Sequence, residues 1–364
     1  MTESGIPSWE LERRESVDRK RETARSGGGQ LIDEYHAARL AVVGTGRVGS
    51  TLARSLAGAG WNVCTVMGSS PRSTSSHRLA TELGCEVASG YESLLEKADV
   101  VLLCVPDSVL EETATALAQI SDWGNDRSQR RLVGHTSGSH GISVLRQLAS
   151  LGWSVFSLHP VVSIAHPDSG PEVLKGKYAG ITASRAALPV AQEMAVSLGM
   201  IPFEVYEEHR PAYHLACSMA SNFLVTLLAI AEQITEGVGI KQGASIFVPL
   251  VESTVANLGV MSPMQALTGP IARGDVPTVR AHLAALEKSI PRLIPCYLEL
   301  ATATLDVARL DAVKREQMET LISEWKLRVL DMETPARESR ALNEASASGL
   351  EATKAWHRGR TVPS

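Results

Sequence analysis

A glycine-rich turn after the first predicted strand constrains this chain more than any other feature. The apolar run Leu40 to Val43 ends at Gly44, and glycines then follow in the spacing G-x-G-x-x-G before an amphipathic helix. In such a turn one glycine allows the bend, one lets the backbone approach a pyrophosphate, and one lets helix and strand pack closely. The free N–H groups of the helix would then face the anion. The pattern predicts a dinucleotide site, the alternative being merely a tight βα turn; its residues are Gly44, Thr45, Gly46, Arg47, Val48 and Gly49.

Composition limits the class of protein and its partners. The chain has 364 residues, 44% hydrophobic and 21% charged, which fits two globular domains. A net charge of −5 gives no reason to expect nucleic acid or an anionic membrane as a partner. No apolar run reaches 18 residues, so we expect no membrane span. The five cysteines are scattered, without C-x-x-C pairs or metal-ligand spacing, which predicts a reduced, cytoplasmic protein without a metal site.

The order of predicted elements divides the chain into four parts. Tails rich in Glu, Arg and Ser, over residues 1–36 and 331–364, are predicted to be disordered. Residues 37–207 alternate strands and helices, which predicts a doubly wound, mainly parallel α/β domain. Strand signals then stop, and residues 208–330 are predicted to form an all-α domain. The expected strands are 39–43, 62–67, 85–88, 99–105, 131–136, 154–158, 178–182 and 202–206; the expected later helices are 211–236, 243–258, 276–289, 292–310 and 312–330.

The segment after the second predicted strand indicates which nicotinamide cofactor binds. NAD-binding domains of this kind place Asp or Glu there to hold the ribose hydroxyls. This chain has Ser69, Ser70 and Arg72 instead, and no acid. A 2′-phosphate needs hydrogen-bond donors and positive charge, so the segment predicts NADP rather than NAD. The alternative is a polar loop that only caps the next helix.

Several strand ends carry side chains suited to proton transfer. Val105 and Pro106 lie at the end of the fourth strand, Ser137 follows the fifth, and His159 lies at the end of the sixth. Ligands bind at this carboxyl edge of a doubly wound sheet, so Val105 and Pro106 are predicted to contact the cofactor. Ser137 and His159 are predicted catalytic residues, since hydride transfer to a carbonyl requires a proton donor and groups that polarise the oxygen. A histidine that is merely hydrogen-bonded at a strand end is the alternative for His159 and for His135.

The first helix of the predicted all-α domain has a polar stripe on an apolar background. His214, Ser218 and Ser221 share one face at i, i+4 and i+7, and Asn222 flanks them. Such a stripe either lines a wet cleft, which we favour, or makes hydrogen bonds between helices. His214 and Asn222 are therefore candidate catalytic residues. Farther along, Arg273 in a Gly/Pro-punctuated segment is a candidate for binding a substrate carboxylate, or else forms an Arg–Asp pair within a turn.

Seven segments together resemble the Rossmann-like proteins with a C-terminal domain of unknown function 2520. They are Val43–Gly49, Val105–Asp107, His135–Gly138, His159–Pro160, Tyr213–His214 with Ser221–Asn222, Pro249–Val251 with Asn257, and Ala266–Asp275. The group is similar to prephenate dehydrogenases, pyrroline-5-carboxylate reductases, ketopantoate reductases and 6-phosphogluconate-type dehydrogenases. The resemblance implies an NADP-linked oxidoreductase whose helical domain closes the site and forms a homodimer. The hydroxyacid dehydrogenases have a lysine one turn before the asparagine; this chain has none near Asn222, and His214 is assigned that role by position.

Three functions follow as hypotheses. In the first, an NADPH-dependent enzyme reduces a small carbonyl acid, with 2-dehydropantoate as the favoured substrate; His214 donates the proton, Asn222 and Ser137 orient the substrate, and Arg273 binds its carboxylate. In the second, the chain is a prephenate-like dehydrogenase or an imine reductase, and His159 and His135 matter more. In the third, the chain binds a nucleotide without turnover, as a sensor. Deazaflavin-dependent relatives leave the hydride partner open as well.

Overall fold

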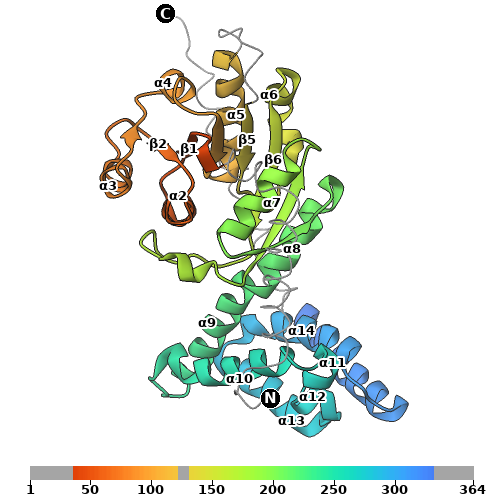
Figure 1. The fold of residues 1–364 in the computed structure, drawn as a ribbon. Coiled ribbons are helices and arrows are strands. Elements are labelled where there is room, and N and C mark those ends of the chain that lie inside the picture. Colours follow the sequence, from red (N-terminus) through yellow and green to blue (C-terminus); the bar gives the residue numbers. More distant parts are fainter. Residues whose placement is uncertain (1–35, 122–130, 332–364) are drawn as a thin grey trace, which may run out of the picture. The chain divides into compact units, whose positions relative to one another are not determined.

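One eight-stranded sheet organises the first part of the chain (Figure 1). The structure, a computed structural model, describes residues 36–121 and 131–331, so the predicted tails lie almost wholly outside the described residues. Within these residues the sheet order is β3-β2-β1-β4-β5-β6-β7-β8, and every neighbouring pair is parallel except β6–β7. The strands are β1 (Leu40–Val43), β2 (Val63–Met67), β3 (Glu86–Val87), β4 (Val100–Leu103), β5 (Leu132–His135), β6 (Ser154–Pro160), β7 (Tyr178–Ala183) and β8 (Ile201–Glu204). The predicted doubly wound, mainly parallel sheet is confirmed.

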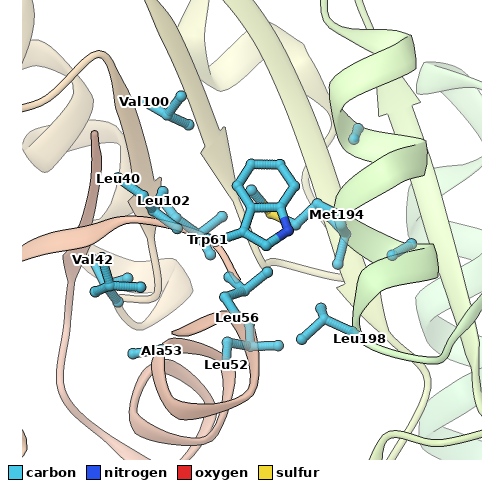
Figure 2. Close-up of a cluster of buried hydrophobic side chains, with 14 of the residues drawn as sticks. Leu40, Val42, Leu52, Ala53, Leu56, Trp61, Val100, Leu102, Met194 and Leu198 are labelled. Atoms are coloured by element: carbon cyan, nitrogen blue, oxygen red, sulfur yellow. The ribbon is translucent and has the colours of Figure 1, made fainter. Parts of the chain in front are cut away.

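Alternating side chains explain why helices cover both faces of the sheet. Leu40 and Val42 of β1 point into one core, while Ala41 and Val43 point into the other. The first core also includes α2 (Arg47–Gly58), α3 (Thr74–Leu83) and α7 (Leu188–Ser197). The second includes α4 (Tyr91–Leu95), α5 (Asp107–Ser121) and α6 (Arg146–Ser150). Figure 2 shows the Trp61 ring in the first core beside Leu56 and Met194, which joins α2 to α7.

The strand order creates a switch point between β1 and β4. From β1 the chain continues to β2 on one side, and β4 lies on the other side of β1. The connections therefore leave in opposite directions, and a crevice opens outside the carboxyl ends of these two strands. Ligands of open α/β sheets bind in such a crevice.

The second compact unit is helical. Contacts divide the chain after Thr226, so α8 (Arg210–Ala220) lies in the first unit and α9 (Asn222–Glu236) spans the division. The later helices are α10 (Val248–Leu258), α11 (Pro263–Ala266), α12 (Pro270–Arg273), α13 (Val276–Ser289), α14 (Ile294–Val307) and a last helix over residues 312–331. The last helix, α13 and α14 supply its buried core. The all-α region is confirmed, while the predicted boundary between residues 207 and 208 stays a prediction.

Two details of the long helical stretch differ from expectation. The single helix expected over 211–236 is two helices, because Ser221 has φ −117° and ψ −66°, away from helical values. The stretch Glu207–Glu236 as a whole is 30 residues long and, by length and composition alone, could cross a membrane. The lack of an unbroken apolar run of 18 residues therefore does not exclude a membrane span. The absence of a membrane span stays a prediction.

Candidate functional site

A cavity of about 1070 Å³ opens at the carboxyl edge of the sheet, in the first unit. It joins the glycine-rich turn after β1 to the ends of β2, β4, β5 and β6 and to α8. Twelve of the predicted site residues line it: Gly44, Thr45, Gly46, Arg47, Val48, Ser69, Ser70, Val105, Pro106, Ser137, His159 and His214. One continuous site thus brings together residues that lie up to 170 positions apart in the sequence.

The glycines of the turn have distinct steric roles. Gly44 has φ +96°, and a Cβ there would lie 2.5 Å from the Cys104 carbonyl oxygen. A Cβ on Gly49 would lie 1.8 Å from the Gly44 oxygen, so α2 can pack on the turn only without that side chain. At Gly46 a Cβ would meet nothing within 4 Å, and this residue is the N-cap of α2 without a side-chain cap. The first amides of α2 are therefore left for a ligand, as an anion-binding turn requires.

A cluster of hydroxyl groups connects the turn to the loop after β2. The Thr45 hydroxyl lies 2.8 Å from that of Ser75 and 3.2 Å from that of Ser76, and Ser73 lies 2.9 Å from Ser75. Ser69 and Ser70, a few residues earlier in the same loop, are exposed and line the cavity. The loop thus offers hydrogen-bond donors and no carboxylate between Met67 and Thr81.

Four predicted site residues do not line the cavity. Gly49 packs beneath the turn, and Arg72 is exposed next to the lining residue Pro71. Asn222 is exposed at the start of α9, and Arg273 is exposed at the end of α12 in the second unit. Asp275 beside Arg273 caps α13 by accepting hydrogen bonds from Thr278. The roles assigned to Arg72, Asn222 and Arg273 stay predictions.

His135 is held by the backbone on both ring nitrogens. It is fully buried, its Nδ1 accepts from the Ser137 amide at 3.2 Å, and its Nε2 lies 2.8 Å from the Gly141 carbonyl oxygen. Because an amide N–H can only donate, the proton of the neutral ring is on Nε2. Burial lowers the pKa of His135 to about 4. His135 therefore orders the turn after β5, which is the alternative that the sequence left open.

His159 and His214 face the cavity together. Their ring centroids are 6.0 Å apart, and a Cβ on Gly138 would lie 2.8 Å from Nε2 of His159 and 2.6 Å from Cδ2 of His214. Burial, with the nearby charge of Arg210, lowers the pKa of His159 to about 4. The His159 ring is therefore neutral near pH 7, and it can donate or accept a hydrogen bond without carrying charge.

Ser137 belongs to a polar network at the N-terminus of α5. The Ser137 hydroxyl lies 3.1 Å from Nδ1 of His140, and Ser139 donates to the Asp107 carboxylate at 2.7 Å. His140 in turn lies 3.6 Å from Asp107. Ser137 and Asp107 line the cavity, so the network places a carboxylate and a hydroxyl group in the cavity that the histidine pair faces.

Two residues that sequence reasoning missed hold α8 against the sheet. Arg210 is fully buried and donates to Thr182 at 2.7 Å and to the Gly180 carbonyl oxygen at 3.2 Å. Glu207 accepts from the amides of Ile142 and Ser143 at 2.6 and 2.9 Å. An arginine at a helix start gives no sequence signal of burial, so these contacts appear only in the fold. Among the described residues, no group of His, Cys, Asp and Glu could hold a metal ion.

Two family models match the chain. A Rossmann-like domain matches residues 28–160, and the domain of unknown function DUF2520 matches residues 177–304. Each model covers little more than a third of the chain, and the chain is similar to a Rossmann-like domain followed by a DUF2520 domain. The DUF2520 match begins before β7, so in this chain that domain contributes the last two strands of the sheet as well as helices. The resemblance predicted from the seven sequence segments is confirmed.

Solved structures share the fold of this chain. A putative NADP oxidoreductase from Bacteroides fragilis is 20% identical, with a TM-score of 0.62 over 75% of this chain and 99% of its own. Protein TM1727 from Thermotoga maritima is 25% identical, with a TM-score of 0.57 over 74% and 98%. An imine reductase from Myxococcus stipitatus, in complex with NADP+, is 19% identical, with a TM-score of 0.50 over 78% and 94%. Curated proteins gave no match.

Proposed function

We propose that this protein is an NADPH-dependent oxidoreductase that reduces the carbonyl group of a small carboxylic acid. The observation that carries the proposal is one cavity, which joins a glycine-rich, anion-binding turn to a pair of histidines and a serine network. A dinucleotide and a small substrate fit a cavity of about 1070 Å³, the upper range of ligand sites.

The residues present fit NADP. The uncapped amides of α2 from Arg47 onward would hold the pyrophosphate, and Val105 and Pro106 would lie along the cofactor. Ser69, Ser70 and Arg72 would hold the 2′-phosphate, because they supply donors and positive charge where NAD-specific domains have an acid. When bound, NADPH supplies the hydride. Support comes also from two structures of the same fold, one named an NADP oxidoreductase and one solved with NADP+.

The chain's own side chains supply proton transfer and orientation. His214 is half-buried and faces the cavity, where its ring can donate a proton to the carbonyl oxygen. Neutral His159 polarises that oxygen through a hydrogen bond. Ser137 lines the cavity and can orient the substrate. From the sequence alone, we assign Asn222 to help orient the substrate and Arg273 to bind its carboxylate in a bidentate fork.

NADPH oxidation, followed by absorbance with a panel of substrates, tests the proposal. The panel contains 2-dehydropantoate as the favoured substrate, other small 2-oxo acids and a cyclic imine, and prephenate is assayed in reverse with NADP+. We expect turnover of a 2-oxo acid, and a fall in kcat of about 100-fold in His214→Gln, the range for loss of a general acid. The exposed His166→Gln is the matched control. Intact kcat in His214→Gln would remove the assigned proton donor.

A second candidate function is favoured by the position of His159. It faces the cavity as a neutral ring, which suits an imine reductase or a prephenate-like dehydrogenase as well as a carbonyl reductase. Turnover of the imine or of prephenate alone would select this candidate. Tight NADPH binding without turnover of any substrate would instead favour a nucleotide sensor.

The helical unit supports a homodimer. Helix α10 has one charged residue, Glu252, and exposes large apolar side chains. Val248, Leu250, Val255 and Leu258 are 46 to 63% exposed, and Val260 and Met261 continue the apolar surface. A protein surface rarely leaves such a patch in water, and a second copy of the chain would cover it. We place the dimer in the cytoplasm, because the five cysteines are free.

A further inference from the structure

Tyr213 contacts the histidine of the proposed site, although the proposed reaction assigns it no task. It is half-buried in the first turn of α8, and its hydroxyl oxygen lies 2.7 Å from Nδ1 of His159. The two rings meet edge to face, with centroids 5.6 Å apart. Tyr213 therefore contacts His159 on the nitrogen opposite the one that faces Gly138 and the cavity.

A glycine makes room for this hydrogen bond. Gly180 of β7 is paired with His159 of β6 in the antiparallel register. A Cβ on Gly180 would lie 2.7 Å from the Tyr213 hydroxyl oxygen and 3.0 Å from Cζ. Gly180 does not have a positive φ, so the backbone does not require glycine here. The absence of a side chain at Gly180 instead provides space for the phenol of Tyr213.

Arg210 fixes the start of the helix that carries Tyr213. Its guanidinium group bonds to β7 through Thr182 and Gly180 and lies 3.4 Å from the Ser137 carbonyl oxygen after β5. It also lies over the Tyr213 ring, 5.8 Å from the centroid. Because a buried arginine with several partners has one arrangement, the first turn of α8 and its phenol are held rigidly against the sheet.

The geometry favours one direction for this hydrogen bond. In a neutral imidazole one nitrogen donates and the other accepts. A phenol O–H is a stronger donor than an imidazole N–H, and the imidazole nitrogen is the stronger acceptor. The distance of 2.7 Å is shorter than the usual 2.9–3.0 Å of an N–H···O bond, and it fits O–H···N. The proton of the His159 ring is then on Nε2.

We infer that Tyr213 is a positioning residue, which donates to Nδ1 of His159 and fixes the Nε2–H tautomer with that N–H directed into the cavity beside Gly138. The inference rests on the proposed function for its catalytic consequence. A fixed Nε2–H always offers a donor to the substrate oxygen, while a ring without Tyr213 would offer a donor for only part of the time. At metal sites, loss of a hydrogen bond that orients a ligating histidine costs roughly tenfold to 100-fold in affinity or activity, and we expect a loss at the lower end of this range here.

The test reads the tautomer directly, by ¹⁵N NMR of the histidine side chains of the full-length protein. The His159 signals are assigned by their loss in His159→Asn. We expect the Nε2–H form in the wild type and a mixture of tautomers in Tyr213→Phe. Gly180→Ala, which displaces the phenol, should give the same mixture, while exposed Tyr206→Phe should give the wild-type spectrum.

Kinetics supply the second measurement. In Tyr213→Phe we expect kcat to fall about tenfold with KM for NADPH unchanged, and the double variant with Gly180→Ala to fall no further. An Nδ1–H form in the wild type, or a Tyr213→Phe variant with unchanged tautomer and kcat, would overturn the inference. The NMR result does not need turnover. A protein without activity would therefore refute the proposed function, and the tautomer would still decide the inference.

Discussion

His135 and His159 end neighbouring strands, yet their surroundings give them different tasks. Backbone groups occupy both nitrogens of His135, whereas His159 keeps one nitrogen toward the cavity. Both rings are neutral, because burial lowers each pKa to about 4. At the scale of a residue, the number of backbone partners separates a histidine that orders a turn from one available to a substrate.

The buried His135 ring makes folding stability depend on pH. The unfolded chain protonates this ring below about pH 6.5, while the folded chain does so only near its pKa of about 4. The unfolded state therefore binds more protons in this window, and the free energy of unfolding falls as pH falls, by at most about 1.4 kcal/mol per pH unit for this ring. Above about pH 6.5 the ring contributes no pH dependence.

Urea unfolding between pH 5.0 and 7.5 measures this dependence. His135→Gln should flatten the slope of the unfolding free energy, while exposed His166→Gln should leave it unchanged. A wild-type free energy that stays level across the window would contradict the buried, neutral ring.

At the scale of an element, the turn from β1 into α2 depends on one missing methyl group. A Cβ on Gly49 would lie 1.8 Å from the Gly44 carbonyl oxygen, and backbone cannot move aside as a side chain can. We expect Gly49→Ala to lower the free energy of unfolding by about 1–3 kcal/mol and to abolish NADPH binding. Thermal unfolding and NADPH fluorescence measure the two effects.

The same helix supplies the control. Gly58 also lies in α2, and a Cβ there would meet nothing within 4 Å. Gly58→Ala should be neutral or stabilise the protein by up to about 1 kcal/mol, because alanine favours the helix. Equal effects of the two substitutions would show that helix propensity, rather than the contact with Gly44, limits the turn.

Elements were more predictable than contacts. Leu40–Val43 and Val100–Leu103 read as buried strands because both faces of a covered parallel strand are apolar, and the glycine spacing located the turn. The break at Ser221 carried no such signal, since neither glycine nor proline, the residues that most strongly interrupt helices, stands there. The hydrogen bond from Tyr213 to His159 joins residues 54 positions apart, and only the pairing of β6 with β7 places them together.

At the scale of the whole molecule, the apolar surface of α10 predicts a dimer. Leu250 is 63% exposed there, and Leu250→Glu should shift the protein toward monomers, because a charge at a buried apolar interface is costly. Leu327, 64% exposed on the last helix, provides the matched control, and Leu327→Glu should leave the dimer intact. Sedimentation in detergent-free buffer gives the masses, and a monomeric wild type would contradict the dimer.

The proposed oxidoreductase function depends on a nucleotide that carries a 2′-phosphate. Ser69 follows β2 in the segment where NAD-specific domains have an acid. Ser69→Asp should therefore weaken the binding of NADPH and favour the binding of NADH. Exposed Ser150→Asp on α6, outside the cavity lining, should change neither affinity.

Titration of the wild-type protein with NADPH and with NADH, followed by calorimetry, is therefore the most direct measurement. We predict that NADPH binds at least about tenfold more tightly than NADH, a difference of about 1.4 kcal/mol. Binding of neither nucleotide, or tighter binding of NADH, would contradict the proposed cofactor site.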